Sequence, residues 1–116
     1  MKPYTPQKIL FKLNSDDRHA MLDKILGMIQ KRLFTHKAVG IKFKDIANTT
    51  GLPKQRISEV YHGRYISEET ILLLVNHGYI RELDLFALDL TAEQGDVLIE
   101  LLDSPSPTPQ SSSKAS

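Results

Sequence analysis

Hydrophobic residues recur every three or four positions along much of this 116-residue chain, a spacing that is typical of amphipathic helices. The first long helix is expected to start at Ser15, whose hydroxyl can cap free N–H groups, and to run to about Leu33. Asp16 and Asp17 would stabilise its positive end. Its expected core face comprises Leu22, Ile25, Leu26, Ile29 and Leu33, with Met21 and Met28 at the edge.

The C-terminal half of the chain predicts three further helices. Ser67 is a good cap for a helix that ends near Gly78, and the expected core face of this helix comprises Ile71, Leu72, Leu74 and Val75. A short helix over residues 80–88 is expected to bury Leu83, Phe86 and Ala87. Thr91 and Gln94 have the spacing of a capping box, which predicts a last helix from Thr91 to about Asp103.

Residues 43–62 have the pattern of two short helices joined by a tight turn. Ala47 is a small residue where two crossed helices would touch, and Gly51 can adopt the positive φ that such a turn requires. Apolar residues stand where the second helix, residues 53–62, would face the first helix and the core: Ile46, Leu52, Ile57 and Val60. This joint pattern predicts a helix-turn-helix that binds double-stranded DNA. The preceding residues 35–42, with His36 among them, are expected to form a solvated, basic connector.

The outward face of the second helix is polar and largely cationic. In the major groove, Gln55 can pair with adenine, Arg56 with guanine, and Glu59 can accept a hydrogen bond from cytosine. The lysines and Arg64 are expected to contact phosphates, which supplies affinity without reading sequence. The candidate DNA-binding residues are Lys42, Lys44, Lys54, Gln55, Arg56, Ser58, Glu59, His62 and Arg64.

Charge is distributed unevenly, although the net charge is only +1. Residues 24–64 contain nine basic and two acidic side chains, whereas residues 65–103 contain nine acidic side chains and Arg81. One face is therefore expected to meet phosphate, and the acidic half to face away from it or to meet a protein partner.

The last helix and the terminal segments complete the expected organisation. Since a helix that is apolar nearly all round must be buried on several sides, and a small bundle has little surface left, self-association is expected through Val97, Leu98, Ile99, Leu101 and Leu102. Residues 104–116 are rich in Ser and Pro and are expected to be a disordered tail. Residues 1–14 predict either a short helix that begins at Thr5 and Pro6 or a basic arm along DNA.

The sequence therefore predicts an all-α fold, a compact helix-turn-helix bundle of about five helices over residues 15–90, followed by a C-terminal oligomerisation helix over residues 91–103 and the tail. The four histidines lack ligand spacing, there is no cysteine, and no catalytic or phosphate-cradling motif occurs, so we expect neither an enzyme nor a metal or other cofactor. No membrane segment or signal peptide is visible, and a cytoplasmic location is expected.

The segment ISEVYHGRYISEETILLLVNHG, residues 57–78, resembles the Cro-type, lambda-repressor-like helix-turn-helix family. The resemblance rests on Ile57 and Ser58, on Gly63 and Arg64, on the Ser67-capped helix with Leu72 to Leu74, and on Ile80 to Leu85. It covers about residues 17–88 and implies a five-helix bundle that reads operators, commonly as a dimer. Phe43 replaces a residue that is often polar in the family, and Leu52 and Pro53 replace the usual Ser or Thr.

Two functions agree with this layout. The favoured one is a sequence-specific transcription regulator of phage or bacterial type, a repressor that occupies its operator as a homodimer. The alternative is a viral small terminase subunit that recognises packaging-start DNA as an oligomeric ring.

Overall fold

A computed structural model describes residues 9–103, and every regular element in this range is a helix. The elements are the 3₁₀ helix η1 (Ile9–Lys12) and the α-helices α1 (Ser15–Ala38), α2 (Phe43–Thr50), α3 (Lys54–Tyr61), α4 (Glu68–Asn76), α5 (Glu82–Phe86) and α6 (Ala92–Leu102). The expected all-α fold is confirmed for this part of the chain. The expectations for a start at Thr5 and Pro6, and for a disordered tail, lie outside the described residues.

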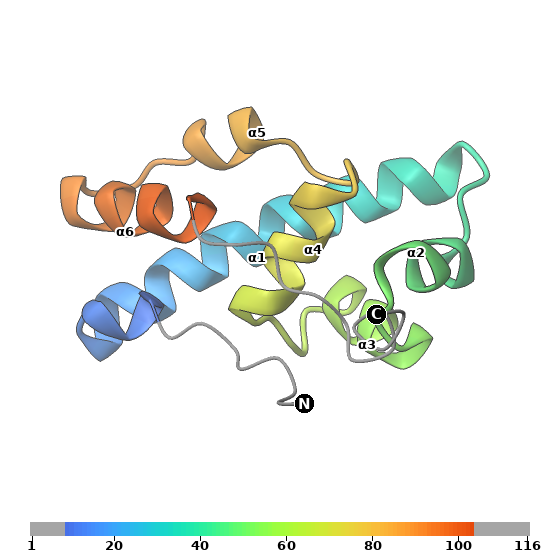
Figure 1. Ribbon diagram of the computed structural model, residues 1–116, viewed down its shortest axis with the longest axis horizontal. Helices are drawn as coiled ribbons and strands as arrows, with labels where there is room; N and C mark the ends of the chain where they lie inside the picture. Colours follow the sequence, from blue (N-terminus) through green and yellow to red (C-terminus); the bar gives the residue numbers. More distant parts are fainter. Residues whose placement is uncertain (1–8, 104–116) are drawn as a thin grey trace, which may run out of the picture.

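Helix α1 runs along the length of the molecule, and the other helices are arranged around it (Figure 1). Its fully buried residues are spaced by four: Met21, Ile25, Ile29 and Leu33. Met21, expected at the edge, therefore lies in the centre of this face, whereas Leu22 and Leu26 are only partly buried.

Both ends of α1 differ from expectation. Asn14, not Ser15, is the N-cap, because its side-chain oxygen accepts a hydrogen bond from the Asp17 N–H at 2.8 Å. The helix continues to Ala38, five residues past Leu33, since no glycine or proline lies between Leu33 and Gly40. The connector to α2 is correspondingly short.

The segment before α1 is part of the core. Leu10 and Leu13 are buried, and the backbone N–H groups of Ile9 and Leu10 donate to the carboxylate of Glu68 at 3.2 and 2.7 Å. For residues 9–13, a basic arm lying along DNA is therefore the wrong interpretation.

Helix α4 crosses α1 in the middle of the molecule (Figure 1), and four consecutive residues, Ile71 to Leu74, are buried. Ser67 caps it as expected, with its hydroxyl accepting from the Thr70 N–H at 3.2 Å. An α-helix buried on all sides in this way is the centre of a core.

Helix α5 differs most from expectation. It has five residues and begins at Glu82, and it buries Leu85 while Ile80 is buried just before it. Leu83 is 72% exposed and Phe86 45%, and Ala87 is also exposed, so the expected core face was wrong. The helix has little more than one turn, so when Leu85 faces the core, Leu83 and Phe86 face outward.

Helix α6 has the expected capping box, with reciprocal hydrogen bonds between Thr91 and Gln94 at 3.0 and 3.1 Å. It packs against η1, α1 and α4, and this contact buries Val97, Leu98 and Leu101 within one chain. The expectation that these three contact a second copy was wrong, because η1 provides the covering surface that the sequence did not reveal. Of the five predicted residues, Ile99 is 49% exposed and Leu102 is partly buried.

Candidate nucleic-acid interface

Helices α2 and α3 form a helix-turn-helix through the predicted turn. Gly51 has φ +83°, and its N–H donates to the Ala47 carbonyl at 2.9 Å, which ends α2. The Thr50 hydroxyl donates to the Ile46 carbonyl at 2.7 Å and accepts from the Leu52 N–H at 3.2 Å. The predicted apolar contacts are confirmed, since Ile46, Ala47, Leu52, Ile57 and Val60 are all buried.

The start of α3 is one residue later than predicted. Pro53 is the N-cap, with extended backbone, and Lys54 is the first helical residue. No side chain caps this end. The first N–H groups of α3 therefore keep their capacity to donate to a ligand.

An aromatic contact that the sequence did not reveal joins the far ends of the two helices. The rings of Phe43 and Tyr61 lie 5.0 Å apart, and Lys37 Nζ stands 5.5 and 5.4 Å from their centroids. Phe43 thus has a packing role. Lys37, in the last turn of α1, is fixed beside α2 and α3 by these rings.

The lysines predicted to contact phosphate gather on one side of the motif. Lys42, Lys44 and Lys54 line a surface hollow of about 370 Å³ together with Lys37 and Phe43. All four lysines are exposed. Four positive charges around one apolar floor provide an attractive site for an anionic backbone.

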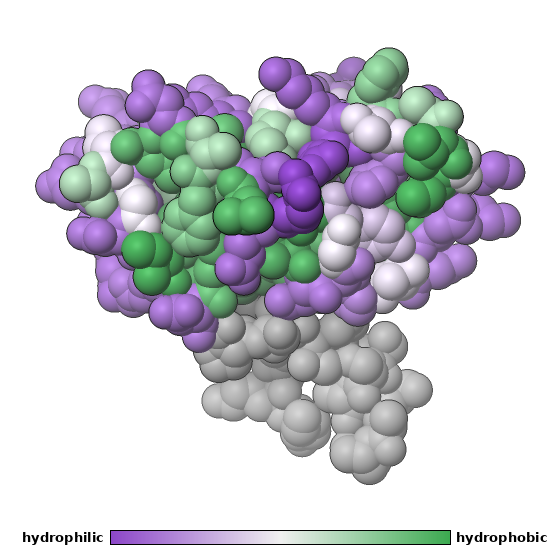
Figure 2. All heavy atoms as spheres, turned by 90° about the horizontal axis from the view of Figure 1, so that it is seen from above, coloured by the Kyte–Doolittle hydropathy of each residue, from purple (hydrophilic) through white to green (hydrophobic). Residues whose placement is uncertain are grey.

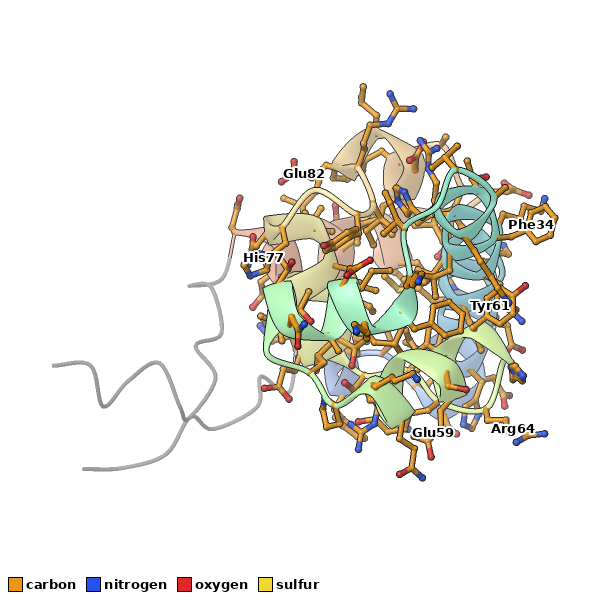
Figure 3. All side chains as sticks on the ribbon, turned by 90° about the vertical axis from the view of Figure 1, so that its right-hand side faces the viewer. Phe34, Glu59, Tyr61, Arg64, His77 and Glu82 are labelled. Atoms are coloured by element: carbon orange, nitrogen blue, oxygen red, sulfur yellow. The ribbon has the colours of Figure 1, made fainter. Side chains whose placement is uncertain are left out.

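The remaining candidates lie along and beyond α3. Gln55 and His62 are exposed, Ser58 and Glu59 are partly exposed, and all four are on the side of α3 opposite to Ile57 and Val60. Figure 3 shows Glu59 and Arg64 pointing away from the helical bundle, on the side opposite to Glu82. Arg64 lines a second, wide hollow with Lys31, Phe34, Tyr61 and His62. The structure thus places all nine candidates on α3 or beside it.

Arg56 is engaged with neighbours rather than extended into solvent. Its Nε donates to Glu59 Oε1 at 3.3 Å, and its guanidinium carbon lies 3.9 Å from the centroid of the Tyr65 ring. The two candidates Arg56 and Glu59 are therefore coupled. The sequence did not indicate Tyr65, which lies in the loop after α3.

The C-terminal end of α3 is anchored to α1. Gln30 Nε2 donates to the Tyr61 carbonyl at 3.0 Å. Gly63 has φ +74°, and a Cβ at that position would lie 3.2 Å from Gln30 Nε2, so a side chain there would disturb the anchor. His36, expected in a solvated loop, lies in α1 and contacts the Tyr79 carbonyl through Nε2 at 2.7 Å.

The lysine hollow and the acidic side chains of α6 lie in different parts of the molecule. The lysine hollow lies at the α2–α3 end, whereas α6 lies toward the other end of α1 and α5 lies over its middle (Figure 1). On α6, Glu93, Asp96 and Glu100 are exposed. In α5, hydrogen bonds from Arg81 and Arg32 hold the pKa of Asp84 below its usual value.

Among residues 9–103, no helix combines the length and the apolar content needed to cross a membrane. Comparison of the chain with protein-family models, with curated proteins and with solved structures found no match.

Proposed function

We propose that this protein is a sequence-specific DNA-binding protein, a transcription regulator of repressor type that inserts α3 into the major groove. The observation that carries the proposal is the joint geometry of α2 and α3: a Gly51 turn, a buried apolar seam, and a polar α3 face beside a hollow lined by four lysines. The Cro-type resemblance of residues 57–78 agrees with it.

Within this proposal, the exposed polar face of α3 and the lysines beside it have different roles. Gln55 stands near the start of α3 on its exposed face, where an amide can form two hydrogen bonds to adenine. Lys42, Lys44 and Lys54 fix the register of the protein on the duplex by contacting phosphates.

Dimerisation is part of the same proposal. Because Val97, Leu98 and Leu101 are buried within one chain, its candidate surface is the apolar surface that α5 and α6 leave exposed. Figure 2 shows hydrophobic side chains gathered over α5 and α6 with hydrophilic residues around them. The exposed members are Leu83, Phe86 and Ile99, and Leu102 is partly buried. We call these four residues the α5–α6 patch. Two copies joined there would present two recognition helices, and operator half-sites on one DNA face are about 34 Å apart.

The proposal is tested by selecting binding sites from a random duplex library with the full-length protein. We expect enrichment of a defined sequence. Gln55→Ala should relax the preference at one base pair and cost ~1–3 kcal/mol of binding free energy. Lys44→Ala should weaken binding to all duplexes alike and lower the slope of log affinity against log salt concentration by about one.

Lys12→Ala is the matched control, because Lys12 lies in η1 and its ion-pair partner is Glu100 of α6. This substitution should leave DNA affinity unchanged. Enrichment of no sequence, or equal effects of the Lys12 and Lys44 substitutions, would contradict the assignment of α2 and α3 as the interface.

A further inference from the structure

Arg56 is held on two sides by neighbouring groups. Glu59, one helical turn later, accepts a hydrogen bond from Arg56 Nε at 3.3 Å. The guanidinium carbon lies 3.9 Å from the centre of the Tyr65 ring, the distance of a stacked cation–π contact. Both Arg56 and Glu59 are about one third exposed, and an ion pair of that kind holds a side chain only weakly. Tyr65 is therefore the contact that fixes the plane of the guanidinium.

The turn after α3 places Tyr65 beside Arg56. Gly63 has φ +74°, and the N–H groups of Gly63 and Arg64 donate back to the carbonyls of Val60 and Glu59 at 3.0 and 2.8 Å. These hydrogen bonds form a Schellman-type ending that reverses the chain along the end of α3. Residue 65 then lies on the flank of α3 that carries Arg56, and its ring packs against the core on its other side.

The contacts leave part of the guanidinium available. Nε is used by Glu59, and among the described residues the two terminal nitrogens have no hydrogen-bond partner. Their outer edge presents two parallel N–H groups. This pair matches the O6 and N7 acceptors of guanine in the major groove, the most common specific contact between a side chain and a base.

We propose that Tyr65 is a positioning residue that holds the Arg56 guanidinium flat and in one orientation, so that its terminal N–H pair reads a single guanine. This inference rests on the proposed function and extends it to a residue outside the recognition helix. An arginine that is ordered before binding loses less conformational freedom when it binds, so its discrimination between bases is stronger.

The test uses the site selected by the wild-type, full-length protein. Each guanine in it is replaced singly by 7-deazaguanine, which lacks the N7 acceptor, and the dissociation constants are compared. One such replacement should raise the dissociation constant of the wild-type protein on the order of 10-fold. For Arg56→Ala, which has no donor for the base, the same replacement should have no further effect.

Substitutions of Tyr65 separate positioning from folding. Tyr65→Ala should lower the preference for that one guanine several-fold, whereas Tyr65→Phe should keep it, since the ring face and not the hydroxyl makes the contact. Tyr79→Ala is the control for lost stability, because Tyr79 packs on His36, away from α3. It should leave the base preference unchanged.

Three results would overturn the inference: a selected site without a guanine that needs its N7, a Tyr65→Ala protein with unchanged preference, or an Arg56→Ala protein that keeps the preference. If Arg56→Ala weakens every duplex equally, Arg56 contacts phosphate and the inference is also wrong. Failure of the wild-type protein to select any sequence would refute the proposed function itself, and is distinguishable from these results.

Discussion

Asp84 is the residue at which two distant parts of the chain are joined by charge. Its carboxylate accepts from Arg32 of α1 at 2.9 Å and from Arg81 at the start of α5 at 3.2 Å. These two hydrogen bonds favour the ionised form, which lowers the pKa of Asp84 in the folded protein. A short helix of five residues is thereby tied to the longest helix of the bundle.

This pairing predicts a pH dependence of stability. Because the folded-state pKa is lowered, the contribution is complete above the pKa of the unfolded chain, about 3.9, and is lost as the pH falls through the lower folded-state value. Asp84→Asn should therefore unfold at a lower temperature than wild type at pH 7, and the difference should shrink below about pH 4.

Thermal unfolding followed by circular dichroism at several pH values measures this difference. Asp89→Asn is the control, since the Asp89 side chain is exposed and its backbone carbonyl, not its carboxylate, accepts from Lys24. A difference between Asp84→Asn and wild type that stayed constant from pH 7 to pH 3 would show that the ion pairs are not its source.

Individual side-chain contacts of the candidate site were only partly predictable from the sequence. The positions of Gln55, Ser58 and His62 on the outward face follow from the placement of Ile57 and Val60, which depends on helical spacing alone. The Tyr65 contact with Arg56 and the Lys37 contact with Phe43 and Tyr61 depend on how the turns return the chain. No spacing rule encodes that return, so these contacts were missed.

At the scale of elements, local signals were the reliable ones. The Gly51 turn and the caps at Ser67 and Thr91 involve residues three or four apart, and all were predicted. Some helix ends were nevertheless misplaced, at both ends of α1 and at the start of α3. The other predictions that failed depend on tertiary packing. Helix α5 has too few residues for its apolar positions to define a face, and the partner of α6 is η1, which is some 80 residues earlier in the chain.

The contact between η1 and the start of α4 gives an element-scale prediction. Glu68→Ala should destabilise the protein by ~1–3 kcal/mol, because the Leu10 N–H is buried and would lose its acceptor. Glu69 lies in the same first turn of α4 but does not accept from η1. Glu69→Ala therefore controls for the loss of a carboxylate at the positive end of the helix dipole.

Urea unfolding of the two variants and of wild type measures the difference. Equal free energies of unfolding for the two variants would mean that Glu68 does not anchor η1.

At the scale of the whole molecule, the α5–α6 patch and the lysine hollow lie on different parts of the surface. A dimer formed through the patch leaves α3 and its flanking lysines exposed for DNA. The sequence indicated self-association, and the structure restricts the residues free to mediate it, because Val97, Leu98 and Leu101 are buried in the core.

We expect the full-length protein to be a dimer by light scattering, and Leu83→Ser to raise its dissociation constant at least several-fold. Leu83 is 72% exposed, and Val39, which is 70% exposed at the end of α1, provides a matched control. Val39→Ser should not change the mass.

A monomeric wild-type protein, or equal effects of the two substitutions, would contradict dimerisation through the α5–α6 patch. A ring of many subunits would instead support the packaging function considered from the sequence.

The packing of α6 against η1 also sets the order in which the core can fold during synthesis on the ribosome. Lys12 pairs with Glu100, and Gln94 donates to the Asp17 carbonyl at 2.9 Å, so these contacts of η1 and α1 form only after residues 94–100 have been synthesised. Until then the surfaces of η1, α1 and α4 that pack against α6 lack their cover. The nascent chain must therefore expose part of its core after α4 has been synthesised, and it can close that core only after α6 has left the exit tunnel.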